Sequence, residues 1–502
     1  MSLVAAIGQA DGTAAGRRRF RAAAGAEPAA GIALLRPVYW IGACIVAGAA
    51  FYFGGLEAVT FAIAVLIALW AFAEPRTALW LLTAFMVYLF VFFQREAPLG
   101  DELPEEFLFW GIGVALITGG LVTATIFSSH VDWSLVRKRL VMPTSFAMLC
   151  MLFAVLAAAS YGLFLGNESF VVARQTFGCV ILPIYYLLAV ALLRSAADVE
   201  HWLRRSCWCV ALGSAWYAVK LSSASAALGY YYREQSPLVG YAGAVGVIAW
   251  STLIEERRPW LRLQALAQGT ACLLAIILMG NRAALASLLA AAGVLSVVAF
   301  RRRGIAAMAM AALLVSGAFA GVAYFGNQML ERRGLTGAIA GRFVITVSED
   351  HSFQGRMAQM DFVVREFERN PVLGAGMGSV SVFFAPGLGR VRVTSVDNGW
   401  GYVMLKMGSL GLAAFAALMA LLFRDAFQAL FRAEARPLRP DSMALLGVLF
   451  YGLVVFWSGP SFFHFTSAAF FGTALAGIVV LAEARRSIAG VPPHATFPAA
   501  PD

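Results

Sequence analysis

The chain is a succession of long apolar runs, and this feature constrains its fold more than any other. Runs near 18 residues recur along most of the 502 residues, and each is long enough to cross the hydrocarbon core of a bilayer. Hydrophobic residues make up 61% and charged residues 13%, whereas a soluble domain is usually about half apolar and a quarter charged. The sequence therefore predicts an all-α, polytopic integral membrane protein. The net charge of +10 is then a topology signal rather than a sign of nucleic-acid binding.

The runs predict about fourteen transmembrane helices, with twelve as the lower bound. About eleven lie within 37–326 and about three within 402–482, on either side of a hydrophilic loop at 327–401. Residues 1–36 are expected to be a disordered cytoplasmic tail without a clear cleavage site, and 483–502 a second cytoplasmic tail. The predicted spans are 38–53, 56–73, 77–93, 107–128, 143–165, 176–193, 207–221, 237–254, 265–280, 283–300, 304–326, 402–423, 442–459 and 462–482.

Loop charges orient these spans. With a cytoplasmic N-terminus, the outer loops are poor in Lys and Arg, and the one at 94–106 is acidic. The positive-inside rule then predicts that the 327–401 loop lies on the outer, periplasmic side of a bacterial inner membrane. The basic clusters that fall on the inner side are 137–139, 204–205, 257–262, 301–303 and 432–439.

The longest apolar run, 265–300, contains Asn281 and Arg282 at its centre. As a single helix it would be about 54 Å long, far more than the roughly 30 Å core. Two short crossings that turn at Gly280, Asn281 and Arg282 keep both flanking basic clusters inside. The sequence therefore predicts a helical hairpin with Arg282 at its outer tip.

The 327–401 loop contains one amphipathic helix. Met357, Met360, Val363, Val364 and Phe367 recur at helical spacing within 356–370, so the helix is expected to lie on the membrane surface or over a cavity. Pro371 ends it, and the glycine-rich stretch 371–379 is expected to form a turn.

Three arginines on the predicted outer side are candidates to bind a diphosphate: Arg233, Arg282 and Arg356. The planar guanidinium donates two hydrogen bonds and stays charged, which suits phosphate. The alternative is that each arginine extends separately to the lipid headgroups. Lys406, four residues inside the span that follows the loop, is expected to extend outward in the same way.

Two side chains in the loop are candidate general bases, Asp397 and His351. The alternatives are a helix cap for Asp397 and a solvated loop residue for His351. Asn398 is a candidate for substrate binding and also for capping the next helix. The six cysteines have no disulfide or zinc spacing, and Cys207-x-Cys209 is expected to pack within a span.

The residues in this order resemble the O-antigen ligase and polymerase (Wzy-like) superfamily of bacterial envelope proteins. The resemblance covers about 230–423, nearly the C-terminal half. It is carried by "REQSPLVGYAG", "MGNRAALASLL", "GRMAQMDFVVREFERNPVLGAGMGS" and "DNGWGYVMLKMGSLGLAAF".

The resemblance implies a GT-C-like integral-membrane glycosyltransferase that takes a glycan from an undecaprenyl-diphosphate carrier. The hypothesis for its mechanism is a displacement with inversion at the anomeric carbon, without a metal, nucleotide or other cofactor. Arg233, Arg282 and Arg356 match the functional arginines of that family. The ligases also have a histidine before the matching asparagine. Here "TSVDN" (394–398) keeps Asn398 but has no histidine, which favours a polymerase of O-antigen, capsule or exopolysaccharide over a ligase that acts on lipid A-core.

Two alternatives stay open. One is the ligase, and the other, from a different class, is a flippase or transporter of lipid-linked oligosaccharides. Transporters of this kind are built from repeats with short loops, and this sequence has one large loop and no visible repeat. A flippase and a chain-length regulator are expected partners.

Overall fold

The computed structural model describes residues 55, 57–92, 105–127, 131–228, 237–303, 351–385, 389–393, 396–431 and 439–489. Helices coincide with twelve of the fourteen predicted spans, and the other two, 38–53 and 304–326, lie outside the described residues. The helices are Glu57–Ala73, α4 Pro75–Phe92, α5 Glu105–Phe127, α6 Trp133–Leu140, α7 Pro143–Phe164, α8 Ser169–Leu192, α9 Ala196–Leu228, α10 Leu238–Glu255, α11 Pro259–Leu278, α12 Arg282–Arg303, α15 His351–Arg369, α16 Gly399–Phe431, α17 Arg439–Phe456 and α18 Phe465–Ala489.

The helices form one packed bundle, and several of them are long and apolar enough to cross a membrane. Helix α8 packs on α18, α7 on α16, and α10 on both α11 and α17. Six segments have the length and composition of membrane spans: Pro143–Phe164, Ser169–Leu192, Leu238–Glu255, Pro259–Leu278, Gly399–Phe431 and Ser467–Arg486. The chain is thus a multi-pass helical membrane protein.

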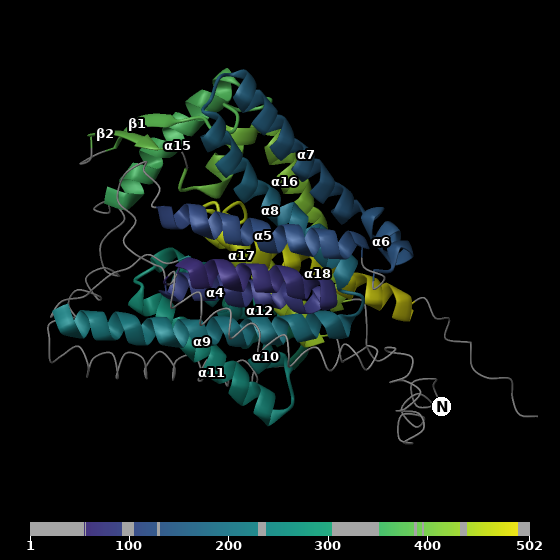
Figure 1. Ribbon diagram of the computed structural model, residues 1–502. Coiled ribbons are helices and arrows are strands. Elements are labelled where there is room, and N and C mark those ends of the chain that lie inside the picture. The colour runs from purple at the N-terminus through teal and green to yellow at the C-terminus, as the bar shows by residue number, and fades with distance from the viewer. Residues whose placement is uncertain are drawn as a thin grey trace, which may run out of the picture.

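The two ends of the bundle differ in kind. Helix α15 and the strands β1 Ser381–Ala385 and β2 Gly389–Val393 lie at one end, here called the loop end, and α6 lies at the other, the α6 end (Figure 1). The strands pair antiparallel, with Phe383 opposite Val391. This hairpin was not predicted, although 379–382 and 390–393 alternate polar residues with valine on either side of a Pro-Gly pair in the sequence.

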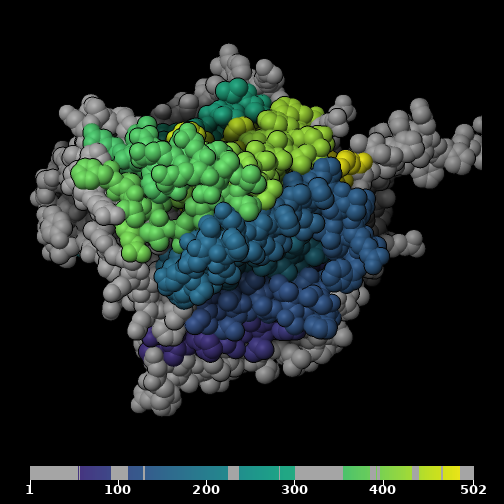
Figure 2. All heavy atoms as spheres, turned by 90° about the horizontal axis from the view of Figure 1, so that it is seen from above, coloured from purple at the N-terminus to yellow at the C-terminus, as the bar shows by residue number. Residues whose placement is uncertain are grey.

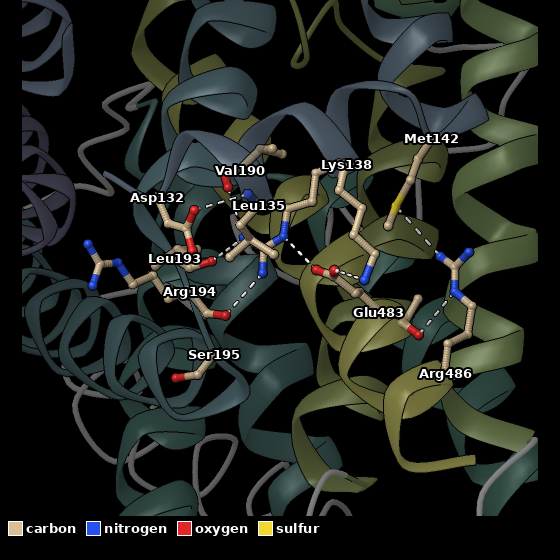
Figure 3. Close-up of polar contacts among 12 residues, drawn as sticks. Asp132, Leu135, Lys138, Met142, Val190, Leu193, Arg194, Ser195, Glu483 and Arg486 are labelled. Atoms are coloured by element: carbon tan, nitrogen blue, oxygen red, sulfur yellow. Dashed lines mark hydrogen bonds and ion pairs between the residues drawn. The ribbon is translucent and has the colours of Figure 1, made fainter. Parts of the chain in front are cut away.

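Buried charges tie the α6 end together. The Arg139 side chain, 2% exposed, donates from Nε to Glu483 Oε2 of α18 at 2.6 Å. It also donates to the carbonyl oxygens of Val190, Leu193 and Arg194 at the end of α8. Lys138 approaches the same carboxylate from the surface, with its Nζ 3.2 Å from Glu483 Oε1. Figure 3 shows the Lys138 and Glu483 side chains facing each other.

Two predicted spans differ in extent from the helices that contain them. The predicted span 207–221 is part of α9, a single helix of 33 residues. Charged residues at its start lower the local hydropathy, but they do not interrupt helical hydrogen bonding. Helix α16, also 33 residues, is broken at Gly408, whose φ of 61° and ψ of −155° are not helical.

Candidate active site

The glycine-rich segment 371–379 connects α15 to the bundle at the loop end. Its backbone donates hydrogen bonds from Met377 N to Ala158 O of α7 (3.0 Å) and from Ala375 N to Leu405 O of α16 (2.6 Å). Gly374, Gly376 and Gly378 all have a positive φ, which only glycine adopts at low cost. Figure 2 shows this part of the chain, in green, lying beside α7 and α8, in blue. The predicted glycine-rich turn is therefore confirmed, and it fixes α15 to the helices.

Helix α15 lies on α16 and β1, so the amphipathic pattern of the sequence matches a real packing face. Val363 is fully buried, while Val364 and Met357 remain exposed. Gln359, 4% exposed, accepts a hydrogen bond from the backbone nitrogen of Asp397 at 2.9 Å. This contact holds residue 397 one helical turn from Arg356.

The structure brings together two of the predicted site residues, Arg356 and Asp397. The distance from Arg356 Nε to Asp397 Oδ2 is 3.9 Å, and the side chains are 40% and 66% exposed. Arg356 Nε forms no hydrogen bond with the described residues. The ion pair is therefore loose: Arg356 Nε is buried, whereas much of the rest of both side chains is exposed and can contact a substrate.

Asn398 acts as the N-terminal cap of α16. Its Oδ1 accepts a hydrogen bond from Gly401 N at 3.0 Å, and the residue is 7% exposed. The capping alternative thus describes Asn398, whereas the Asp397 carboxylate points to the accessible side. Because Asn398 supplies the cap, the Asp397 carboxylate before it is left exposed and can act as a general base at the start of α16.

The predicted hairpin with Arg282 at its tip is confirmed for the backbone. Helix α11 ends at Leu278, Gly280 turns with a φ of 62°, and Asn281 Oδ1 accepts from Ala284 N at 3.0 Å. Arg282 then begins α12.

The Arg282 end of α12 lies at the loop end. Trp250 Nε1 of α10 donates to Ala292 O and Ser296 Oγ of α12, and the Cβ position of Gly246 lies 3.1 Å from Leu288. Both helices therefore start at the same end. Tyr451 OH, near the end of α17, donates to Val239 O at the start of α10.

The end of α17 in turn contacts the Asp397 region. Phe456 lies against Gly399, and the Cβ position of Gly459 is 3.6 Å from Asp397 O. Leu295 of α12 contacts Gly447 of α17. Arg282 is thirteen residues before Leu295, so it lies about 20 Å closer to the loop end along α12. Arg282 is then level with the turn that carries Gly459, on the same end as Arg356 and Asp397.

Three predicted site positions have no described side chain. Arg233 lies outside the described residues, although the helix that follows it, α10, begins at the loop end. Arg282 and His351 are the first residues of α12 and α15, and the placement of their side chains is outside the description. Among the described residues no group of three or more His, Cys, Asp or Glu side chains could hold a metal ion.

The outward orientation predicted for Lys406 is wrong. Lys406 is fully buried and donates from Nζ to Ser379 O (2.5 Å) and to Ser379 Oγ (2.9 Å). Snorkelling assumes that only lipid surrounds the helix, but here the segment 371–379 folds back over α16. No pattern local to Lys406 could have shown this contact.

Residues 269–416 match a family model described as O-antigen ligase (Wzy_C). The match extends over just under a third of the chain and includes the 280–282 turn, α15 and the Arg356–Asp397 pair. It confirms the resemblance to the O-antigen ligase and Wzy-like superfamily. No curated protein matches the chain. Members of this family are glycan-transferring enzymes, and the family includes ligases and related polymerases that act on lipid-linked glycans in a membrane.

Proposed function

We propose that the protein is a polysaccharide polymerase that joins undecaprenyl-diphosphate-linked repeat units at the periplasmic face of the inner membrane. The observation that supports this most directly is the Arg356–Asp397 pair at the head of α16. It combines a cation with a free carboxylate, within the segment that matches the family.

The orientation rests on the basic residues of α6, of the segment after α8, and of α16 and α18 near the α6 end. These include Arg137, Lys138, Arg194, Arg424 and Arg486. Such a concentration favours the cytoplasmic side, and long loops such as 327–401 are exempt from the rule. The loop end then faces the periplasm.

The reaction is a displacement at the anomeric carbon of the donor. The acceptor hydroxyl oxygen forms the new bond to this carbon, and the bond from the carbon to the diphosphate oxygen breaks. Asp397 accepts the hydroxyl proton, and the electron pair leaves with the diphosphate. Arg282, Arg233 and Arg356 stabilise the negative charge that develops on this leaving group.

The absence of a histidine in 394–398 supports a polymerase over a ligase. Asp397 occupies the place before the helix cap, with its carboxylate exposed. We therefore assign the base role to Asp397 and keep His351, at the start of α15, as the second candidate.

The test compares charge-removing variants of the site with matched variants on α15. In a deletion strain, Arg356→Gln or Asp397→Asn should lower polymer yield by at least about 100-fold, because a positioned base or charge contributes about that much. Asp361→Asn and Arg365→Gln remove the same charges from exposed positions on α15 and should leave the size distribution of surface polysaccharide unchanged. Long polymer in both site variants would overturn the proposal.

A further inference from the structure

Three membrane spans have their ends side by side at the α6 end. Helix α7 begins at Pro143, and the spans in α8 and α18 end at Leu192 and Arg486. Arg139 of α6 connects them, because it donates to Glu483 of α18 and to carbonyl oxygens at the end of α8. Helix α6 therefore lies at the boundary of the membrane, at the depth of the lipid headgroups.

The outward surface of α6 combines apolar side chains with cations. Trp133, Arg137 and Val141 are exposed and recur every fourth residue, so they lie on one face of the helix. Lys138 is exposed as well, while Asp132 caps the start of the helix. Tryptophan beside basic residues is typical of helices in the headgroup region, where the ring enters the apolar layer and the cations meet the headgroups.

The apolar part of this surface continues along α7. The exposed apolar side chains of α7 form a stripe opposite the face that packs on α8 and α16: Phe146, Leu149, Phe153 and Leu156. From Phe146 to Leu156 the helix rises about 15 Å, which is half the roughly 30 Å thickness of the hydrocarbon core. An acyl chain of one leaflet therefore fits along this stripe, with its headgroup at α6.

Positive charge remains at α6 after the ion pairs have formed. Glu483, the carboxylate that Lys138 approaches, already pairs with the buried Arg139. Arg137 and the exposed Arg486 form no ion pair within the part of the chain that the structure describes. Arg486 lies beside the turn between α6 and α7 (Figure 3). The excess of cations is complementary to the charge of an anionic headgroup.

We propose that Trp133, Arg137, Lys138 and Arg486, here called the α6 surface, bind an anionic phospholipid of the adjacent leaflet, with one acyl chain along α7. An acidic protein is the alternative partner. The stripe on α7 favours the lipid, because it leads from the α6 surface into the hydrocarbon core, where an acyl chain can follow and a soluble protein cannot. This site is separate from glycan transfer, since α15 lies at the opposite end of the bundle (Figure 1).

The test measures binding of phosphatidylglycerol and of phosphatidylcholine to the purified full chain by native mass spectrometry. The wild type should bind phosphatidylglycerol more tightly. A cation at an anionic headgroup contributes about fivefold, so Arg137→Gln and Lys138→Gln should each weaken phosphatidylglycerol binding about fivefold and leave phosphatidylcholine binding unchanged. Trp133→Ala should weaken binding of both lipids. Arg204→Gln removes an exposed arginine near the start of α9, at the same end, and should change neither affinity.

Equal wild-type affinity for the two lipids, or unchanged phosphatidylglycerol binding in the Arg137→Gln/Lys138→Gln double variant, would overturn the site. A fivefold loss in Arg204→Gln would show that net charge alone governs binding and would overturn it too. Full displacement of phosphatidylglycerol by soluble polyglutamate would identify an acidic-protein surface instead. Arg137 forms no ion pair with the described residues, so Arg137→Gln should fold normally and can decide the result alone. Because no glycan substrate is present, the outcome is independent of the proposed function.

Discussion

At the scale of single residues, Arg139 shows how a charge is accommodated inside the bundle. The last carbonyl groups of a helix have no partner within it. Arg139 donates to one such group, Val190 O of α8, and to the carbonyl oxygens of Leu193 and Arg194, the two residues that follow the helix. Its remaining nitrogen pairs with Glu483. One side chain therefore closes the end of α8 and attaches α18 to it.

Replacing Arg139 by Leu should lower the free energy of unfolding by about 3–5 kcal/mol, because it leaves a buried carboxylate and several carbonyl groups without their donor. The measurement is denaturant unfolding in detergent micelles. Lys138, whose side chain is 65% exposed, is the other partner of Glu483. Lys138→Leu should lower the free energy of unfolding by under about 1 kcal/mol. An equal loss of stability in the two variants would contradict a stabilising role for the buried Arg139–Glu483 pair.

Residue types in the sequence predicted part of the candidate site, but they did not predict which of the nearby side chains are buried. The motif around Asp397 and Asn398 was visible in the sequence, including the capping alternative that the Asn398–Gly401 bond bears out. Lys406 was misassigned because its partner, Ser379, is 27 residues earlier. A contact of that kind depends on the path of a loop, which side-chain chemistry alone does not determine.

At the scale of elements, the segment 371–379 determines where α15 sits. A Cβ at Gly376 would lie 2.7 Å from Gly162 Cα of α7, and the φ of Gly376 is 76°. The backbones of the segment and of α7 are in direct contact at this point. The docking of α15 therefore requires glycine, which has no side chain, at position 376.

Gly376→Ala should therefore separate the segment from α7 and abolish polymer formation while the bundle stays folded. Gly355→Ala, within α15, meets nothing within 4 Å and should instead stabilise the helix by up to about 1 kcal/mol. The readouts are surface polysaccharide size and proteolysis of the loop in membranes. Normal polymer from Gly376→Ala would show that the docking is dispensable.

The elements predicted best were those whose flanking charged residues fix the side of the membrane on which they begin and end. The α11–α12 hairpin followed from the basic clusters on both sides of a run too long for one crossing. The start of α9 was missed because Asp198, Arg204 and Arg205 are charged, although a helix tolerates charge outside the bilayer core. The strands β1 and β2 are five residues each, and the short polar–valine alternation at 379–382 and 390–393 that accompanies them was overlooked.

At the scale of the whole molecule, the sequence predicted the class of fold but not the neighbours of each helix. Hydropathy identifies spans because each must satisfy its backbone in lipid. It contains no information on pairing, so the contacts of α7 with α16 and of α8 with α18 became apparent only in the structure.

The proposed orientation predicts which end a membrane-impermeant maleimide can reach. In intact cells with a permeable outer membrane, Phe384→Cys, at a position 72% exposed in β1, should be labelled. Val141→Cys, at a position 82% exposed at the α6 end, should be labelled only after the inner membrane is opened. The unsubstituted chain gives the background from the native cysteines. The reverse pattern would place the loop end in the cytoplasm.

The most direct test of the central claim is polymerisation by the purified full chain of a single, chemically defined lipid-linked repeat unit in nanodiscs. The account predicts a ladder of products separated by one repeat, formed by the wild type and by Asp361→Asn but not by Asp397→Asn. No ladder from the wild type, with transfer of the glycan to added lipid A-core instead, would identify a ligase and contradict the account.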